Sequence, residues 1–211
     1  MNYLQLCQRV HDIAGFQGQF NSVSATGYQA VIVRAVQDAY EDIQRYRDDW
    51  DFLQKRKVVG VGPSQSVYTL ADLGLENLQQ YKYVNFNSRR MMEMEFETYQ
   101  LYDFSNWSTH QPHYWSWEYA TMDFYISPVG ENYDIEINYI DELDTLSINT
   151  DTPRILSRHH QCIVYGALMK VGTYLGKMTL YDMYAIKYAE ALGQLMRESN
   201  PPKRITKRPI A

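Results

Sequence analysis

Residues 27–52 read GYQAVIVRAVQDAYEDIQRYRDDWDF and contain the strongest periodic pattern of the chain. Large or apolar side chains recur there at steps of three and four residues, which places them on one stripe of an α-helix. Charged residues between them can pair at the same spacing. The apolar stripe consists of Ile32, Val36, Ala39, Tyr40, Ile43, Tyr46 and Trp50. The pattern predicts a helix over about residues 27–50, with Ser24 or Thr26 as its N-cap.

Helical spacing also occurs at the start of the chain and again after Pro153. Residues 2–14 have the spacing of a short amphipathic helix that Gly15 can end. A third helical pattern runs from about residue 155 to Gly176, and a fourth covers about residues 179–198 before an Asn-Pro-Pro sequence. The stripe expected in the fourth helix contains Met183, Ile186, Ala189, Leu192 and Met196.

Between these helical ends the hydrophobic period changes from about 3.6 to about 2. Apolar and polar residues alternate in segments 92–97, 122–126 and 134–140. In the first segment, we expect the two methionines and Phe96 on one face of a strand within residues 89–104, and the three glutamates on the other. Such alternation is typical of an antiparallel sheet with one solvated face.

The order of these patterns predicts an α+β fold. We expect a helical bundle from the N- and C-terminal helices, an inserted antiparallel β-sheet or sandwich block, and an extended C-terminal tail. The expected divisions are N-terminal helices at 1–55, a β-rich insert at 56–150, C-terminal helices at 151–199 and a basic tail at 200–211. Neither helical end is long enough to form a core comfortably alone.

The composition is that of a globular protein, with 45% apolar and 21% charged residues. The formal net charge of −5 gives the body no electrostatic reason to bind nucleic acid. No apolar run approaches the roughly 20 residues of a membrane span, and we expect no signal peptide. Cys7 and Cys162 lie far apart in helical patterns, so we expect two buried, reduced thiols.

Acidic side chains of the β block could form a catalytic carboxylate pair, as in glycosidases. However, an acidic face opposite an apolar face is what alternation produces by itself, so we favour the solvated side of a sheet over a catalytic pair. The acidic residues concerned are Glu93, Glu95, Glu97, Asp123, Asp134 and Glu136.

The histidines and cysteines do not have the spacing of a catalytic or metal-binding motif. His159 and His160 are adjacent at a helix start, where neighbouring side chains diverge by about 100°. His110 and His113 have no cysteine nearby, and Cys162 is interpreted as a buried thiol. The chain contains neither a G-x-S-x-G sequence nor a phosphate-binding glycine loop. We therefore predict no enzyme activity, no cofactor and no metal.

Two regions are candidates for contacts with other molecules. Trp115, Trp117 and Tyr119 alternate along one predicted strand, where they can form sheet core, a protein interface or a sugar-stacking platform. The tail can contact DNA, an acidic groove of a partner, or nothing, and a basic arm that orders on a partner is a common use of such a segment. Its cationic residues are Lys203, Arg204, Lys207 and Arg208.

The two ends of the chain resemble a known family. MNYLQLCQRV and the helix YQAVIVRAVQDAYEDIQRYRDDWDFL are similar to the start of head-to-tail adaptor (connector) proteins of tailed bacteriophages. In that family an acidic, aromatic helix end precedes a β-rich middle, and residues 49–52 stand at that place here. RHHQCIVYGALMKVGTYLGKMTLYDMYAIKYAEALGQLMRE resembles the closing pair of helices. The resemblance covers residues 1–53 and 153–199, whereas the β block matches only in position and character.

This resemblance implies a structural protein of the virion neck, made in the cytoplasm of the bacterial host. Such adaptors form a homo-oligomeric ring, commonly of twelve subunits, below the portal protein, and they link the capsid to tail, nozzle or stopper proteins. DNA passes through the ring without sequence-specific binding, and no membrane is involved. The C-terminal segment typically reaches toward the portal, so the basic tail is the candidate portal-binding segment.

Two other functions remain open at this point. A carbohydrate-binding or hydrolysing β module would use the tryptophans and the glutamates of the β block. Another tail or baseplate structural protein of the same virion would share most of the features described above.

Overall fold

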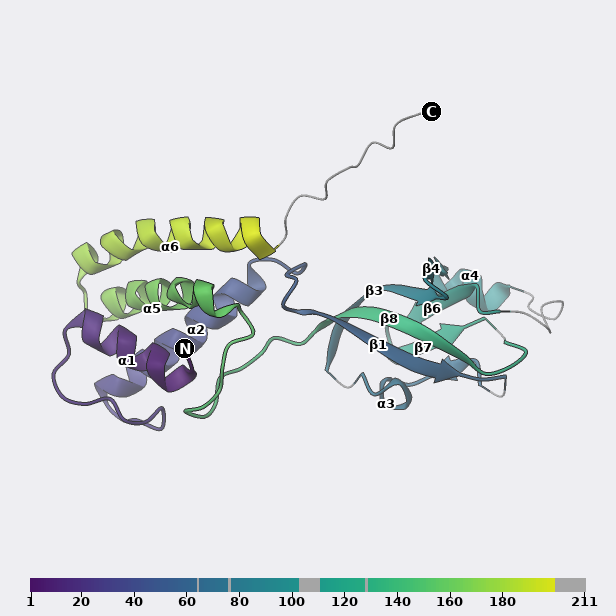
Figure 1. Cartoon of the computed structure of the whole chain (residues 1–211), viewed down its shortest axis with the longest axis horizontal. Helices are drawn as coiled ribbons and strands as arrows, with labels where there is room; N and C mark the ends of the chain where they lie inside the picture. The colour runs from purple at the N-terminus through teal and green to yellow at the C-terminus, as the bar shows by residue number, and fades with distance from the viewer. Residues whose placement is uncertain (64, 76, 103–110, 128, 200–211) are drawn as a thin grey trace, which may run out of the picture. The chain divides into compact units, whose positions relative to one another are not determined.

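A computed structural model of the protein describes residues 1–63, 65–75, 77–102, 111–127 and 129–199. The fold is α+β, as the sequence predicts. The chain forms two compact units (Figure 1). The helical unit contains residues 1–52 and 143–199, and the β unit lies within residues 53–142.

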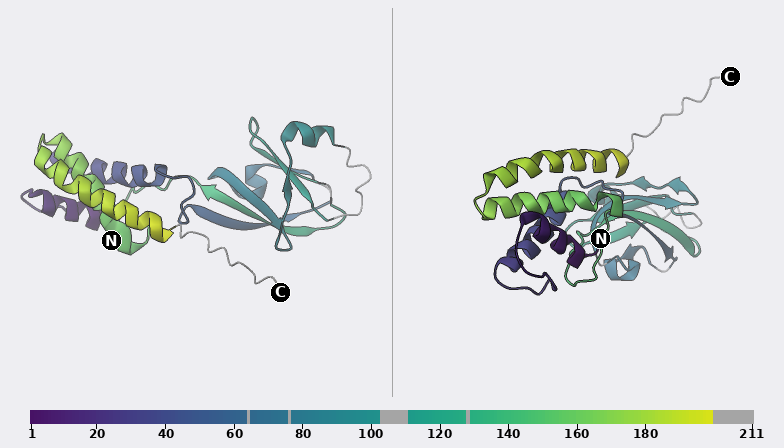
Figure 2. Two further views of the ribbon diagram at one scale, coloured as in Figure 1. Left: turned by 90° about the horizontal axis from the view of Figure 1, so that it is seen from above. Right: turned by 60° about the vertical axis from the view of Figure 1, so that its left-hand side comes forward.

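The helical unit is built around one central helix, α5, in which nine of fifteen residues are buried. The other three long helices all pack against α5, and the two views of Figure 2 show their arrangement. A short 3₁₀-helix, η1, leads into α5. The bounds are α1 Tyr3–Ala14, α2 Tyr28–Arg45, η1 Ser157–His159, α5 His160–Tyr174 and α6 Met178–Ser199.

Helix α2 buries most of the predicted stripe, but it ends earlier than predicted. Tyr46 follows the last helical residue and is 57% exposed, so its place in the stripe was wrong. Trp50 is buried beyond the helix end, where its indole Nε1 donates to the carbonyl oxygen of Ile43 at 2.8 Å. The expected cap at Ser24 or Thr26 was also wrong: Gly27 is the N-cap, with a φ of 64° and no side-chain hydrogen bond. This left-handed conformation favours glycine.

The β unit consists of two four-stranded sheets, in the orders β1-β8-β3-β4 and β2-β7-β6-β5. One hydrophobic cluster contains residues from both sheets, including Val84 and Ile137 of the first and Trp115 and Phe124 of the second. The paired strands are antiparallel except for β5 and β6. The strands are β1 Gln54–Val61, β2 Val67–Tyr68, β3 Leu78–Phe86, β4 Arg89–Arg90, β5 Met92–Glu93, β6 Tyr114–Glu118, β7 Asp123–Ile126 and β8 Tyr133–Asp141. Two short helices are α3 Leu70–Leu73 and α4 Phe96–Leu101.

The structure confirms the strand predicted from one alternating segment and contradicts the strand predicted from another. In β8, Ile135, Ile137 and Tyr139 are buried as the alternation predicts. The strand predicted within residues 89–104 was wrong, because this region forms β4, β5 and α4 instead. Met91 is the buried methionine there and Met92 is exposed. Each of β4 and β5 is only two residues long, so no strand is long enough to give the alternating segment a single buried face.

Both cysteines are buried and free, as predicted. Burial raises the pKa of the Cys7 thiol, and equally that of Cys162, to about 12. The thiols are therefore protonated at neutral pH. Across the described parts of the chain, no helix combines the length and apolar character needed to span a membrane.

Candidate interaction surfaces

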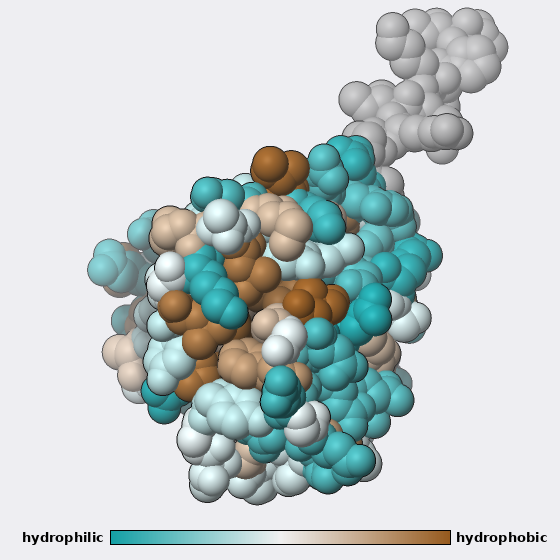
Figure 3. Space-filling view, turned by 90° about the vertical axis from the view of Figure 1, so that its left-hand side faces the viewer, coloured by the Kyte–Doolittle hydropathy of each residue, from teal (hydrophilic) through white to brown (hydrophobic). Residues whose placement is uncertain are grey.

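A groove runs between α2 and α5 on the surface of the helical unit. It has a volume of about 360 Å³ and is lined by Ala30, Val31, Arg34, Ala35, Asp38, Lys170 and Tyr174. The small side chains of Ala30 and Ala35 form the bottom of the groove and make it deeper. The charged residues of the lining lie beside this apolar part. In Figure 3, apolar side chains gather in the centre of a face of the helical unit and hydrophilic ones surround them. The groove is a concave surface suited to an apolar side chain of a partner.

A smaller cavity of about 220 Å³ continues along α5 from Lys170 toward α6. Gly166 contributes to its lining, and a Cβ atom at this glycine would stand 3.1 Å from both Ala39 and Tyr188. The lack of a side chain at residue 166 therefore lets three helices pack closely here. Lys170 forms an ion pair with Asp42 at 2.7 Å, which links α5 to α2.

Two large apolar side chains of α6 are exposed among charged residues, which differs from the sequence-based prediction. Met183 and Ile186 were expected in the buried stripe, but they are 47% and 66% exposed. The helix instead buries Tyr184, Leu192 and Leu195. Helical periodicity groups residues on a face, but it does not determine which of two apolar faces is covered.

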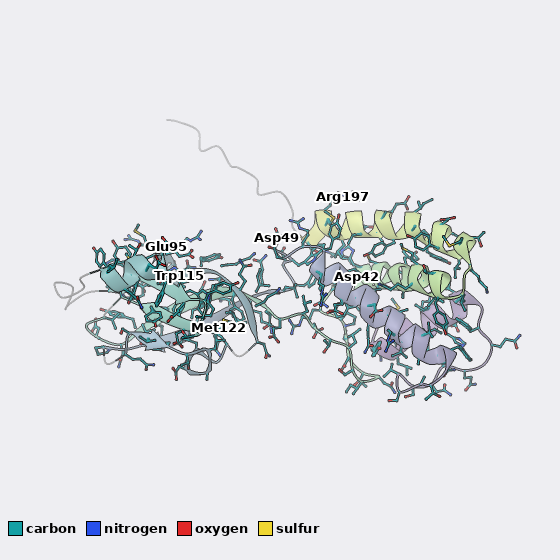
Figure 4. The ribbon with its side chains drawn as sticks, turned by 180° about the vertical axis from the view of Figure 1, so that it is seen from behind. Asp42, Asp49, Glu95, Trp115, Met122 and Arg197 are labelled. Carbon is teal, nitrogen blue, oxygen red and sulfur yellow. The ribbon has the colours of Figure 1, made fainter. Side chains whose placement is uncertain are left out.

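The aromatic residues of the β unit do not share one exposed face. Trp115 is only 2% exposed, and its ring stacks on Phe124 with centroids 5.3 Å apart. Figure 4 shows Trp115 among the strands of the β unit. Trp117 packs edge-on against Tyr81. Tyr119 lies beyond the end of β6 and is 85% exposed.

This arrangement removes the flat platform that a sugar ring would need. One of the three rings belongs to the core, and the rings of Trp117 and Tyr119 are inclined by 77° to each other. Tyr119 remains the residue of this group that is available to a protein partner.

The glutamates of the first alternating segment also separate. Glu93 lies in β5, Glu95 is the residue before α4, and Glu97 is in the first turn of that helix. The expected shared strand face was therefore wrong. Glu136 is held by the amides of Asn138 and Asn85, which lower the pKa of its carboxyl. Within the described ranges, no group of three or more His, Cys, Asp and Glu side chains is placed to hold a metal ion.

The adjacent histidines act as structural links. His160 has its Nε2 atom 2.8 Å from the carbonyl oxygen of Ile155, and burial lowers the pKa of its imidazole. His159 has its Nε2 atom 3.1 Å from Oε2 of Glu198. Arg158 approaches the same carboxylate at 2.8 Å. These contacts attach the last turn of α6 to the segment that precedes α5. His110 lies outside the described residues.

A comparison with family models identifies the family of the chain. Residues 1–207 match the family model described as SU10 adaptor protein. The chain belongs to the SU10 adaptor protein family. A search of curated proteins found no match. SU10 adaptors are phage proteins, so the family predicted from the helical ends is confirmed. The match spans both units, which places the β unit within the SU10 adaptor as well.

The predicted contact residues in the tail of this SU10 adaptor lie beyond the part of the chain that the structure describes. Lys203, Arg204, Lys207 and Arg208 lie outside the described residues, so a role in portal binding stays a prediction. Sequence analysis missed the groove between α2 and α5. The only available signal was the small size of Ala30 and Ala35, since a small side chain leaves space beside a helix.

Proposed function

We propose that this phage adaptor is a head-to-tail protein of the virion neck, which forms a ring below the portal and links the capsid to the tail. The observation that carries the proposal is the match to the SU10 adaptor family over residues 1–207. The proposed partners are other copies of the chain, the portal protein, and tail, nozzle or stopper proteins. In this role the protein is a structural component and not an enzyme.

The charge of the chain supports passage of DNA through such a ring. A channel should not bind phosphates tightly, because each neutralised phosphate adds affinity that slows movement. A net charge of −5 per chain satisfies this requirement. In a ring of about twelve copies the charges repel one another, so the proposal requires apolar subunit contacts that outweigh the repulsion.

The two units are proposed to divide these roles. The helical unit would form the ring, because it carries the groove with its apolar part and the exposed apolar side chains of Met183 and Ile186 on α6. The β unit would face tail components, with Tyr119 among its contacts. The basic tail would bind the portal through its four cationic residues.

The decisive experiment is assembly with and without the portal protein of the same phage. We expect portal and adaptor to form a ring-shaped complex that native mass spectrometry and negative-stain microscopy detect. A chain in which Lys203, Arg204, Lys207 and Arg208 are all changed to alanine should bind the portal more weakly and keep its fold. If the purified chain forms no ring alone and does not associate with the portal, the neck assignment is wrong.

Microscopy of virions that carry a labelled adaptor distinguishes the neck from another tail or baseplate position. Label at the junction of head and tail supports the proposal. Label at the distal end of the tail contradicts it.

A further inference from the structure

Two large apolar side chains of α6, Met183 and Ile186, form a ridge that the helical unit itself does not cover. Met183 and Ile186 are neighbours on this ridge, three residues apart. Asp182 and Glu190 lie one helical turn before and after Ile186, so two carboxylates bracket its side chain. Among the described residues, neither carboxylate forms an ion pair. The ridge therefore presents an apolar centre between two carboxylates, with the exposed Lys187 ammonium beside it, 5.1 Å from the centre of the Tyr184 ring.

The groove between α2 and α5 is also apolar with charged residues at its side: Arg34, which can face a ridge carboxylate, and Asp38 one helical turn later, which can face Lys187. Its apolar part is formed by Ala30, Val31 and Ala35, and its volume is about 360 Å³. Arg34 is exposed in its lining and has no ion-pair partner among the residues that the structure describes. A helix packs against two others when its projecting side chains enter the groove between them.

We propose that the two surfaces meet between copies of this chain. The ridge of α6 in one copy packs into the α2–α5 groove of the next copy, with Ile186 on the alanine floor and Asp182 or Glu190 beside Arg34. This inference rests on the proposed ring, and it names the contact that forms the ring. Ridge and groove are different surfaces of one unit, so the contact is heterologous and repeats head to tail.

Disulfide cross-linking tests the pairing directly, because the native cysteines are both buried. Val31→Cys and Ile186→Cys are introduced together, and assemblies formed with the portal are oxidised mildly. The double variant should give a ladder of covalent multimers on a non-reducing gel. A mixture of the two single variants should give dimers and nothing larger, and each single variant should stay monomeric.

The matched control pairs Ile186→Cys with Leu156→Cys, an exposed residue outside both surfaces. This pair should give no ladder. If Ile186→Cys alone forms dimers, α6 packs against α6 in a two-fold contact, and the proposed pairing is wrong.

Charge exchange gives a second, independent readout. Arg34→Glu should raise the adaptor concentration needed for half-maximal assembly by at least tenfold, because it places a carboxylate next to a ridge carboxylate and so replaces attraction by repulsion. Glu190→Arg in the same chain should restore assembly. If rings form with the portal but neither cross-linking nor charge exchange has the expected effect, the contact is wrong and the neck function stands. If the unmodified chain forms no ring, both proposals fail.

Discussion

The helical unit and the β unit differ in how many of their buried polar side-chain atoms lack a hydrogen-bond partner. Among the described residues, the β unit buries three polar side-chain atoms without a hydrogen-bond partner, and the helical unit buries one. Those of the β unit are the Tyr81 hydroxyl, the Trp115 Nε1 atom and the Ser116 hydroxyl. The atom in the helical unit is Nε2 of His11.

In the helical unit, buried polar groups connect α2 to the chain that returns from the β unit. Tyr40 donates to Oδ2 of Asp144 at 2.8 Å and accepts from the backbone N–H of Arg154 at 2.9 Å. Gln44 donates to the carbonyl oxygen of Asp144 at 2.9 Å and accepts from its N–H at 2.8 Å. A satisfied network specifies one arrangement, whereas an unsatisfied buried group contributes a cost without specifying a partner. The network therefore specifies how α2 packs against residues 144–154.

The largest effect is expected for Trp50, whose contact with the end of α2 is predicted to stabilise the helical unit. Trp50→Ala removes a buried indole and its hydrogen bond to Ile43, so unfolding should be easier by about 3–5 kcal/mol. Urea unfolding followed by circular dichroism at 222 nm measures this change. Tyr119→Ala, at an exposed site, is the control and should change stability by less than about 0.5 kcal/mol. Equal effects of the two substitutions would contradict the structure.

The next effect concerns the network itself. Tyr40→Phe leaves the Asp144 carboxylate and the Arg154 N–H without this hydroxyl, so it should destabilise the helical unit by about 1–3 kcal/mol. The urea midpoint, monitored by helical circular dichroism, gives the value. An unchanged midpoint would mean that water replaces the hydroxyl and that the network does not specify how α2 packs against residues 144–154.

The matched substitution in the β unit should have a smaller effect of the opposite sign. The Tyr81 hydroxyl is buried without a partner, so Tyr81→Phe removes a cost and should leave stability unchanged or raise it by up to about 1 kcal/mol. Tryptophan fluorescence reports mainly on this unit, because three of the four tryptophans, including Trp115 and Trp117, lie within residues 53–142. A loss as large as that of Tyr40→Phe would show that the hydroxyl has a partner in solution and would remove the contrast between the units.

The smallest effect is a pH dependence. The N–H groups of Ile148 and Ser147 lower the pKa of the Asp151 carboxyl. A lowered pKa in the folded state means that the folded protein binds fewer protons than the unfolded chain. The stabilisation is therefore present above the ordinary aspartate pKa of about 3.9 and is lost as the pH falls through the folded-state value.

Asp151→Asn should accordingly reduce the drop in the urea midpoint between about pH 7 and about pH 3. The expected change is small because this carboxylate is well solvated. An unchanged drop would show that the turn at residues 147–151 does not depend on this charge.

Much of the secondary structure could be predicted, because the spacing of apolar residues along the chain indicates which segments form helices and strands and which face is buried. The spacing of Ile32, Val36, Ala39 and Ile43 identifies α2, and all four are buried. The alternation of Ile135, Ile137 and Tyr139 identifies β8 in the same way. The sequence patterns at both ends also led to the family that the match over residues 1–207 shows.

The candidate surfaces depended on tertiary structure. Periodicity placed Ile186 with Leu192 on one stripe. In the structure, Leu192 is buried and Ile186 is exposed, because α5 packs against only one side of α6. Alternation likewise placed Trp115, Trp117 and Tyr119 together, but the short length of β6 and the facing sheet separate them. The sequence by itself determined which residues form each helix and most of the strands, since local spacing controls this. Only the packing of neighbouring elements decided which apolar faces stayed uncovered, because burial depends on residues that are distant in the chain.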